Sequence, residues 1–148
     1  MRRVLQIRDE PSPPLRVALV DSNAVFRAAC RALLITEGVD VVADLAPGYE
    51  AIELVHRLRP DVVLVEAIGR APRGQEIAAL ISSLPDAPSV LLICTDDRSE
   101  LAAAIGARGY LARADICAEA IAGAMATPSY PQRNPSSGRL SGATEEKG

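Results

Sequence analysis

Aromatic residues are scarce in this 148-residue chain. Phe, Tyr and Trp together make up 3% of it, and Trp is absent. Modules that hold single-stranded nucleic acid stack bases on exposed aromatic side chains, so the composition argues against that class. The net charge is −3 and no basic stripe is present, which argues against binding DNA through its phosphates. We therefore expect no nucleic-acid binding by this segment alone.

Histidine and cysteine are also rare. His56 is the only histidine, and Cys30, Cys94 and Cys117 lie far apart without a CxxC pair. This pattern disfavours a disulfide framework and a thiolate or imidazole metal site, and it favours a reducing, cytoplasmic location. Because no nucleophile stands beside a base, we predict that the protein is not an enzyme. No apolar run is long enough for a signal peptide or a membrane span, so no membrane partner is expected.

The chain is instead rich in aliphatic residues, which alternate between strand-like and helix-like spacing. Hydrophobic residues make up 49% of it and charged residues 24%. We expect strands at 16–20, 39–45, 61–65, 89–93 and 110–112, and helices at 24–37, 49–58, 75–84, 98–107 and 115–125. Repeated strand–helix alternation with nearly continuous apolar strands predicts an α/β fold, a parallel sheet covered by helices on both faces.

Three segments follow from these patterns. Residues 1–14 end in a proline-rich stretch and are expected to form a flexible N-terminal arm, residues 15–126 form one domain, and residues 127–148 form a disordered tail or linker. Within the domain, Asp115 is expected to cap the last helix. The first helix is expected to turn one apolar face inward, made of Val25, Ala28, Ala29, Ala32 and Leu33.

Polar residues collect where the predicted strands end. In open parallel sheets, ligands bind beyond the carboxyl ends of the strands. The first strand delivers Asp21 and Ser22 there, and the third delivers Glu66. The fourth delivers Cys94 followed by Asp96 and Asp97, and the fifth delivers Tyr110 and Arg113. This edge is therefore the candidate functional site.

Three stretches in this order carry a family resemblance. VALVDS at 17–22, RPDVVLVE at 59–66 and GARGYLAR at 106–113 resemble response-regulator receiver domains of the NarL/LuxR type, over roughly residues 15–125. The resemblance implies a flavodoxin-like (βα)5 fold with a doubly wound parallel sheet in the order 2-1-3-4-5. It also implies a cytoplasmic role in two-component phosphorelay signal transduction and transcription regulation.

The family's chemical positions are mostly altered. By the resemblance, Glu66 stands at the phosphoacceptor aspartate, Ser22 at the second acid after the first strand, Cys94 at the Thr or Ser, and Arg113 at the lysine. Asp21 keeps the first acid, and Tyr110 keeps the aromatic switch position. Losing the carboxylate at position 22 weakens magnesium binding, which leaves Asp21 and Glu66 as residual metal candidates and no expected cofactor. The set indicates an atypical, degenerate pseudo-receiver.

An arginine prefers a bidentate carboxylate partner, so we predict a Glu66–Arg113 ion pair that fills the phosphoryl and metal site. Other interpretations stay open. Glu66 would be a solvated strand end, a mimic of the phosphorylated charge, or part of an inert site. Asp21 or Asn23 would cap the first helix. Cys94 and Tyr110 would serve in packing alone.

Three functions fit these observations. The first is a pseudo-receiver that signals without aspartyl phosphorylation, either through partner-protein contacts or as a homodimer through the alanine-rich face from Asp97 to Met125. The second is the receiver part of a DNA-binding helix-turn-helix regulator whose output domain is absent from this chain. The third is a receiver whose altered pocket senses a small ligand.

Overall fold

The computed structural model describes residues 13–67, 73–95 and 99–126 and contains five parallel strands. The strands are β1 (Arg16–Val20), β2 (Asp40–Leu45), β3 (Val62–Glu66), β4 (Ser89–Cys94) and β5 (Gly109–Ala112). The helices are α2 (Ala24–Thr36), α3 (Tyr49–Leu58), α4 (Arg73–Ser82), α5 (Ser99–Ile105) and α6 (Ala118–Ala126), with a short 3₁₀ turn, η1 (Arg113–Asp115). The strand order is β2-β1-β3-β4-β5, which confirms the flavodoxin-like α/β fold.

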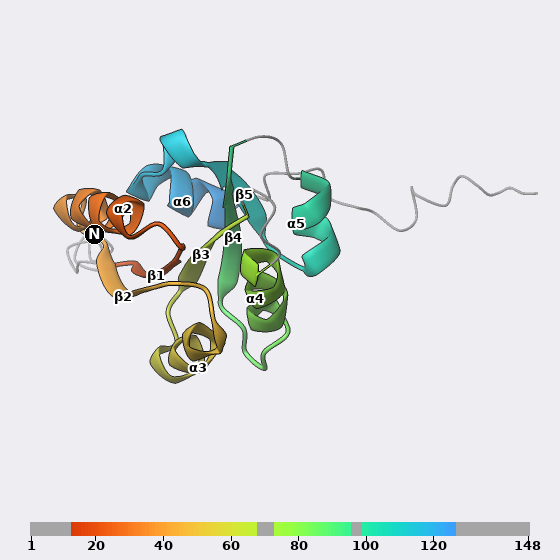
Figure 1. The fold of residues 1–148 in the computed structure, drawn as a ribbon. Helices are drawn as coiled ribbons and strands as arrows, with labels where there is room; N and C mark the ends of the chain where they lie inside the picture. Colours follow the sequence, from red (N-terminus) through yellow and green to blue (C-terminus); the bar gives the residue numbers. More distant parts are fainter. Residues whose placement is uncertain (1–12, 68–72, 96–98, 127–148) are drawn as a thin grey trace, which may run out of the picture.

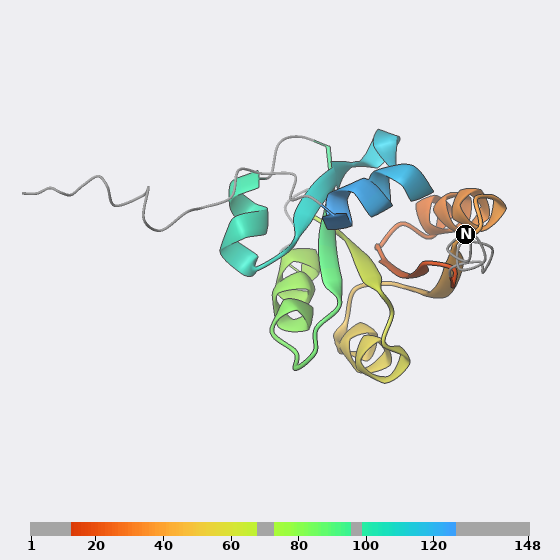
Figure 2. The same ribbon diagram turned by 180° about the vertical axis from the view of Figure 1, so that it is seen from behind.

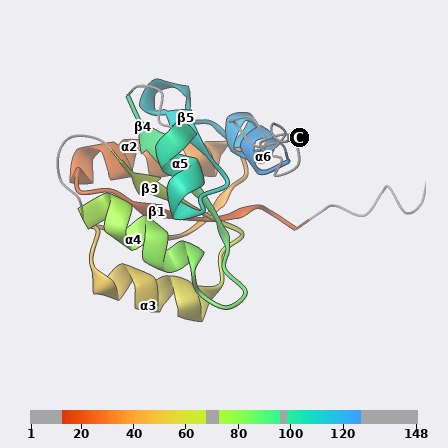
Figure 3. The ribbon, with the colours of Figure 1, turned by 90° about the vertical axis from the view of Figure 1, so that its right-hand side faces the viewer.

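The helices form two layers on the sheet. Helices α2 and α6 cover one face, and α3, α4 and α5 cover the other (Figures 1 and 2). The side view in Figure 3 shows α3 and α4 below β1 and α2 above it. Each crossover between parallel strands therefore passes over one face of the sheet, as this topology requires.

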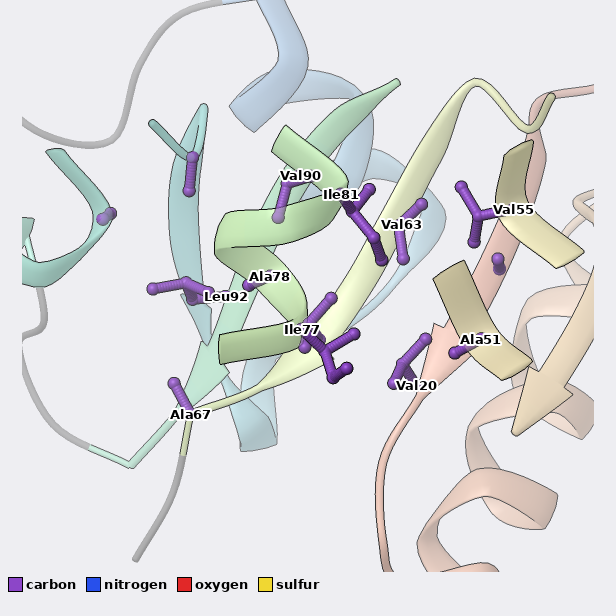
Figure 4. Packing of buried hydrophobic residues seen from close by; sticks show 14 of the residues in the cluster. Val20, Ala51, Val55, Val63, Ala67, Ile77, Ala78, Ile81, Val90 and Leu92 are labelled. Carbon is purple, nitrogen blue, oxygen red and sulfur yellow. The ribbon is translucent and has the colours of Figure 1, made fainter. Parts of the chain in front are cut away.

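The core is aliphatic on both faces. Figure 4 shows Val55 of α3 and Ile77 and Ile81 of α4 packed against Val20 and Val63 of the strands. On the other face the buried cluster includes Leu34, Leu64, Leu91 and Ile121. Leu101 and Ile105 of α5 pack partly buried against the first cluster, as their spacing predicts. Branched aliphatic side chains thus fill the volume that aromatic residues fill in other cores.

The predicted inward face of α2 is wrong. Val25 is 79% exposed and Leu33 42% exposed, whereas Cys30 and Leu34 are buried. The remaining members of the predicted face, Ala28, Ala29 and Ala32, are exposed as well. The helix is apolar around most of its circumference, so spacing alone did not fix its rotation. Contacts with β2 fix it, because Arg27 and Arg31 both pair with Asp44, at 3.3 and 2.9 Å.

The predicted cap of the last helix is also wrong. Asp115 lies in η1, and α6 begins three residues later at Ala118. The backbone N–H of Ala118 donates instead to Glu37, which follows α2, at 2.6 Å. A carboxylate 81 positions away in the chain serves the helix start, and local sequence rules do not reveal such a partner.

Other element ends differ from prediction by one or two residues. The α2 helix ends before Gly38, whose φ of +87° suits glycine, as expected. The predicted arm at 1–14 and the tail at 127–148 lie almost wholly outside the described residues and stay predictions. Among the helices the structure describes, none has the length and apolarity needed to cross a bilayer.

Candidate functional site

The carboxyl ends of β1 and β3 place two acidic residues side by side. These strands pair in register from Val17 with Val62 to Val20 with Val65, so the next residues, Asp21 and Glu66, end up at the same edge. Asp21 is 2% exposed and Glu66 is 9% exposed, and they are the two buried charged residues of the described core. Two carboxylates in one poorly hydrated place need compensating donors.

Asp21 obtains its donors from its own loop and from the fifth strand's end. The backbone N–H of Asn23 donates to Asp21 Oδ1 at 2.8 Å, and Arg113 Nη2 lies 3.2 Å from each carboxylate oxygen. The Arg113 guanidinium also stacks on the Phe26 ring, 3.9 Å from its centroid. Asn23, whose side chain accepts from the Phe26 N–H, is the N-cap of α2. Asp21 is therefore free to hold the arginine.

Glu66 obtains its donors from Ser22. The Ser22 N–H donates to Glu66 Oε2 at 3.1 Å. The Ser22 hydroxyl donates to Glu66 Oε1, also at 3.1 Å. The longer side chain of glutamate thus spans from β3 to the loop after β1. Gly74 of α4 lies directly against the Glu66 backbone, where an added Cβ would meet the carbonyl oxygen. Both ends of Glu66 are fixed by neighbours.

The predicted Glu66–Arg113 ion pair is wrong in its acidic partner. Arg113 pairs with Asp21, and Glu66 pairs with Ser22. The sequence offered two acids to one arginine and gave no basis for choosing between them. The ring of Phe26, the chain's only phenylalanine, supports the Arg113 guanidinium beside Asp21 and so favours Asp21 as its partner. Neither Phe26 nor Gly74 was among the residues predicted for the site.

Burial sets the protonation of Asp21. Loss of hydration raises the pKa of this carboxyl above its ordinary value of 3.8, and the charge of Glu66 raises the pKa further. The Asn23 N–H and the Arg113 charge act in the opposite direction without cancelling the rise. The folded protein therefore binds a proton at Asp21 more tightly than the unfolded chain does.

Replacing Asp21 by asparagine should stabilise the fold at neutral pH, because it removes a carboxylate whose charged form is disfavoured by burial. Because the folded-state pKa is raised, ionisation costs stability as the pH rises from 3.8 through the folded value, and the full cost is present above it. Urea unfolding at a series of pH values should show the gain of Asp21→Asn shrinking as the pH falls towards 3.8. A gain that is independent of pH would contradict the ionisation argument.

Cys94 is the last residue of β4 and Tyr110 lies in β5, the two strands beyond β3 in the sheet order. Cys94 is fully buried, and its Sγ lies 3.9 Å from the Leu111 carbonyl oxygen. Tyr110 is partly buried and packs against the core cluster on the α3, α4 and α5 face.

Cys30, on the opposite face, has a thiol pKa raised to about 11 by burial, with a further contribution from Asp21. Buried, protonated Cys30 is a packing residue rather than a nucleophile.

The donor set does not fit a magnesium ion. Magnesium requires oxygen ligands in near-octahedral geometry, usually including carboxylates. Both Asp21 oxygens face a guanidinium, both Glu66 oxygens accept from Ser22, and Ser22 contributes a hydroxyl where a carboxylate would anchor the ion. Within the described part of the chain, no group of three or more His, Cys, Asp or Glu residues is placed to hold a metal. Asp96 and Asp97 lie outside the described residues.

Two cavities lie at the opposite edge of the sheet. One of about 320 Å³ is lined by His56, Arg59, Asp61 and Asp86, near the start of β3. The second, of about 260 Å³, lies beside it at the start of β4 and includes Arg108. His56 is exposed on α3, as expected, and is far in the fold from the carboxyl ends of the strands. It takes no part in the acidic site.

Comparison with known proteins agrees with the geometry, although no protein-family model matches the chain. The transcriptional regulatory protein LnrK of Bacillus subtilis is 33% identical over 117 residues, covering 76% of this chain and 53% of that protein. The signal receiver domain of the response regulator NarL from Mycobacterium tuberculosis is 32% identical, with a TM-score of 0.60 over 71% of this chain and 88% of that one. A LuxR-family response regulator from Aurantimonas sp. SI85-9A1 is 28% identical, with a TM-score of 0.66 over 76% and 86% of the two chains.

A five-stranded doubly wound sheet with buried acids at the carboxyl ends of β1 and β3 defines a signalling receiver module. The chain belongs to the response-regulator receiver family, with NarL- and LuxR-type regulators among its relatives. It spans about half the length of the first curated relatives it matches, most of which are transcriptional regulatory proteins. The expected family and fold are thereby confirmed.

Proposed function

We propose that this chain is an atypical receiver that transmits signals without aspartyl phosphorylation. The observation that carries the proposal is the occupation of its acidic site by internal partners. Ser22 satisfies both oxygens of Glu66, and Arg113 lies against both oxygens of Asp21. A phosphoryl group and its metal would have to displace the ion pair of Asp21 and the hydrogen bonds of Glu66. The reversible charge of a phosphorylated receiver is replaced here by fixed charges.

The chemistry of Glu66 supports the same conclusion. Its carboxylate lies one methylene further from the backbone than an aspartate's, so it sits where a phosphoryl group would be transferred. Ser22 then takes the role of a hydrogen-bond donor to that carboxylate instead of a metal ligand. The arrangement holds a permanent negative charge at the end of β3. We infer that it keeps the module in one signalling state, which a partner protein or a second copy reads.

Phosphoryl transfer tests the proposal directly. After incubation with acetyl phosphate and Mg²⁺, intact-mass spectrometry should show no phosphoryl adduct on the native chain. The variant that combines Glu66→Asp with Ser22→Asp and Arg113→Lys restores the family's residues at three of the four altered positions and should gain one hydroxylamine-sensitive phosphoryl group. A stoichiometric, magnesium-dependent adduct on the native chain would refute the proposal.

Two other functions are also candidates for this chain. Because most curated relatives are transcriptional regulatory proteins, an output domain that binds DNA beyond this segment is the second candidate. A receiver whose altered site senses a small ligand is the third candidate. We also propose a cytoplasmic, non-enzymatic role. The dimer face from Asp97 to Met125 stays a prediction, and Asp97 itself lies outside the described residues.

A further inference from the structure

The larger cavity at the amino edge of the sheet has the size of a small-molecule site. Its volume of about 320 Å³ falls within the roughly 300–1,000 Å³ that such sites span. It lies between the turn from α3 into β3 and the loop from α4 into β4, at the edge opposite the acidic site. We call it the amino-edge cavity, and its lining includes Val55, His56, Arg59, Asp61, Leu84 and Asp86.

Each wall of the amino-edge cavity contains a residue in an unusual backbone conformation. Arg59 and Asp86 both have a φ of +54°, and among the described residues they are the only non-glycine residues with positive φ. Such residues are uncommon and cluster at functional sites, where neighbours hold them in place. Arg16 does so here, because its Nη1 donates to the Arg59 carbonyl oxygen at 2.8 Å. The same two walls contain three prolines, whose fixed φ restricts them further: Pro60, Pro85 and Pro88. A ligand therefore meets walls that are already ordered.

Charged side chains of the lining are available to a ligand. Within the described part of the chain, the side chains of His56, Arg59 and Asp86 have no hydrogen-bond or ion-pair partner. Asp61 is partly engaged, since its Oδ2 accepts from the Arg16 N–H at 2.8 Å. Arg59 and Asp86 belong to different walls, so the cavity presents a free guanidinium on one side and a free carboxylate on the other.

The electrostatics of the amino-edge cavity favour a ligand that carries both signs of charge. Helix α3 ends at Leu58 and α4 ends at Ser82, both at this edge, and helix C-termini attract cations. Asp86 adds a full negative charge, so a cationic group is attracted to its wall. Arg59 presents a planar guanidinium, which pairs well with a carboxylate. Because the described residues bring no three metal-ligating acids, cysteines or histidines together, the cationic group is an organic ammonium.

We propose that the amino-edge cavity binds a free amino acid with an aliphatic side chain. The ammonium group of the ligand pairs with Asp86, and its carboxylate pairs with Arg59. Val55 is buried and Leu84 is partly buried in the core cluster, and both offer an apolar surface to the ligand's side chain. A ligand with one charge would satisfy one wall and leave the other unpaired. The proposal does not depend on whether the acidic site is phosphorylated, because that site lies at the other edge of the sheet.

Isothermal titration calorimetry of L-leucine into the full chain tests the charged contacts. The native protein should bind one equivalent, and Arg59→Gln and Asp86→Asn should each raise the dissociation constant about tenfold, since each removes a charge-assisted hydrogen bond. Arg57→Gln is the matched control, because Arg57 is exposed on α3 but is not part of the lining, and its affinity should equal that of the native chain. Unchanged thermal unfolding shows that the three variants are folded.

Ligand analogues and amide chemical shifts test the ligand class and the place of binding. The analogue 4-methylpentanoate lacks the ammonium group and 3-methylbutylamine lacks the carboxylate, so each should bind about tenfold more weakly than L-leucine or worse. In ¹⁵N-HSQC titrations, shifts should centre on residues 55–61 and 84–89. The proposal is overturned if L-valine, L-leucine and L-isoleucine all fail to bind at millimolar concentration, or if either analogue binds as tightly as L-leucine. Shifts centred on Asp21 and Glu66 would also overturn it, since they would place the ligand in the acidic site.

Discussion

Replacing Gly74 by alanine should destabilise the fold by about 1–3 kcal/mol, because the new methyl group overlaps the Glu66 carbonyl oxygen. The same methyl would also lie 3.2 Å from Glu66 Cγ, tighter than ordinary packing. Helix α4 cannot simply move outward, since Ile77 and Ile81 anchor it in the core. Urea unfolding monitored by circular dichroism measures the loss.

Gly123→Ala provides the matched control. Gly123 is also in a helix, α6, but no atom lies within 4 Å of an added Cβ. There alanine should stabilise the protein by about 0.5–1 kcal/mol, because it restricts the unfolded chain and favours helix. Opposite signs for the two variants would separate close packing from helix propensity. If Gly74→Ala were neutral, the tight contact between α4 and the end of β3 would be disproved.

Replacing Arg113 by alanine should cost about 2 kcal/mol at neutral pH, because it leaves the buried Asp21 carboxylate beside Glu66 without its cation. The arginine side chain is 27% exposed and that of Asp21 is 3% exposed. The cost of breaking the ion pair therefore comes mainly from the Asp21 carboxylate, which stays buried without its partner. The stacking of the guanidinium on Phe26 is lost as well. Thermal and urea unfolding of the variant at pH 7 give the magnitude.

The double-mutant cycle identifies the cause. In an Asp21→Asn background, position 21 carries no buried charge that could be left unpaired, so Arg113→Ala should cost less than about 1 kcal/mol. Equal costs in the two backgrounds would mean that Arg113 acts through packing on Phe26 alone. A parallel Glu66→Gln background should show weaker coupling, since Glu66 takes its hydrogen bonds from Ser22.

The strands were predictable because buried parallel strands are short, continuous apolar runs, and their order followed from the resemblance to receiver domains. The rotation of α2 was not predictable, because its apolar residues cover most of its circumference. The start of α6 was not predictable either. Its first N–H is served by Glu37, which lies far away in the sequence.

The sequence by itself determined which charged residues reach the candidate site, since Asp21, Glu66 and Arg113 each end or follow a strand whose carboxyl end lies at one edge of the sheet. It also determined that the site holds two acids and one arginine, with serine in place of a third acid. Only the tertiary structure decided the pairing. Arg113 binds Asp21 because Phe26 supports its guanidinium there, and Glu66 reaches Ser22 because β1 and β3 are adjacent. Pairing among charges depends on distances of a few ångströms between separate elements, and residue order does not specify those distances.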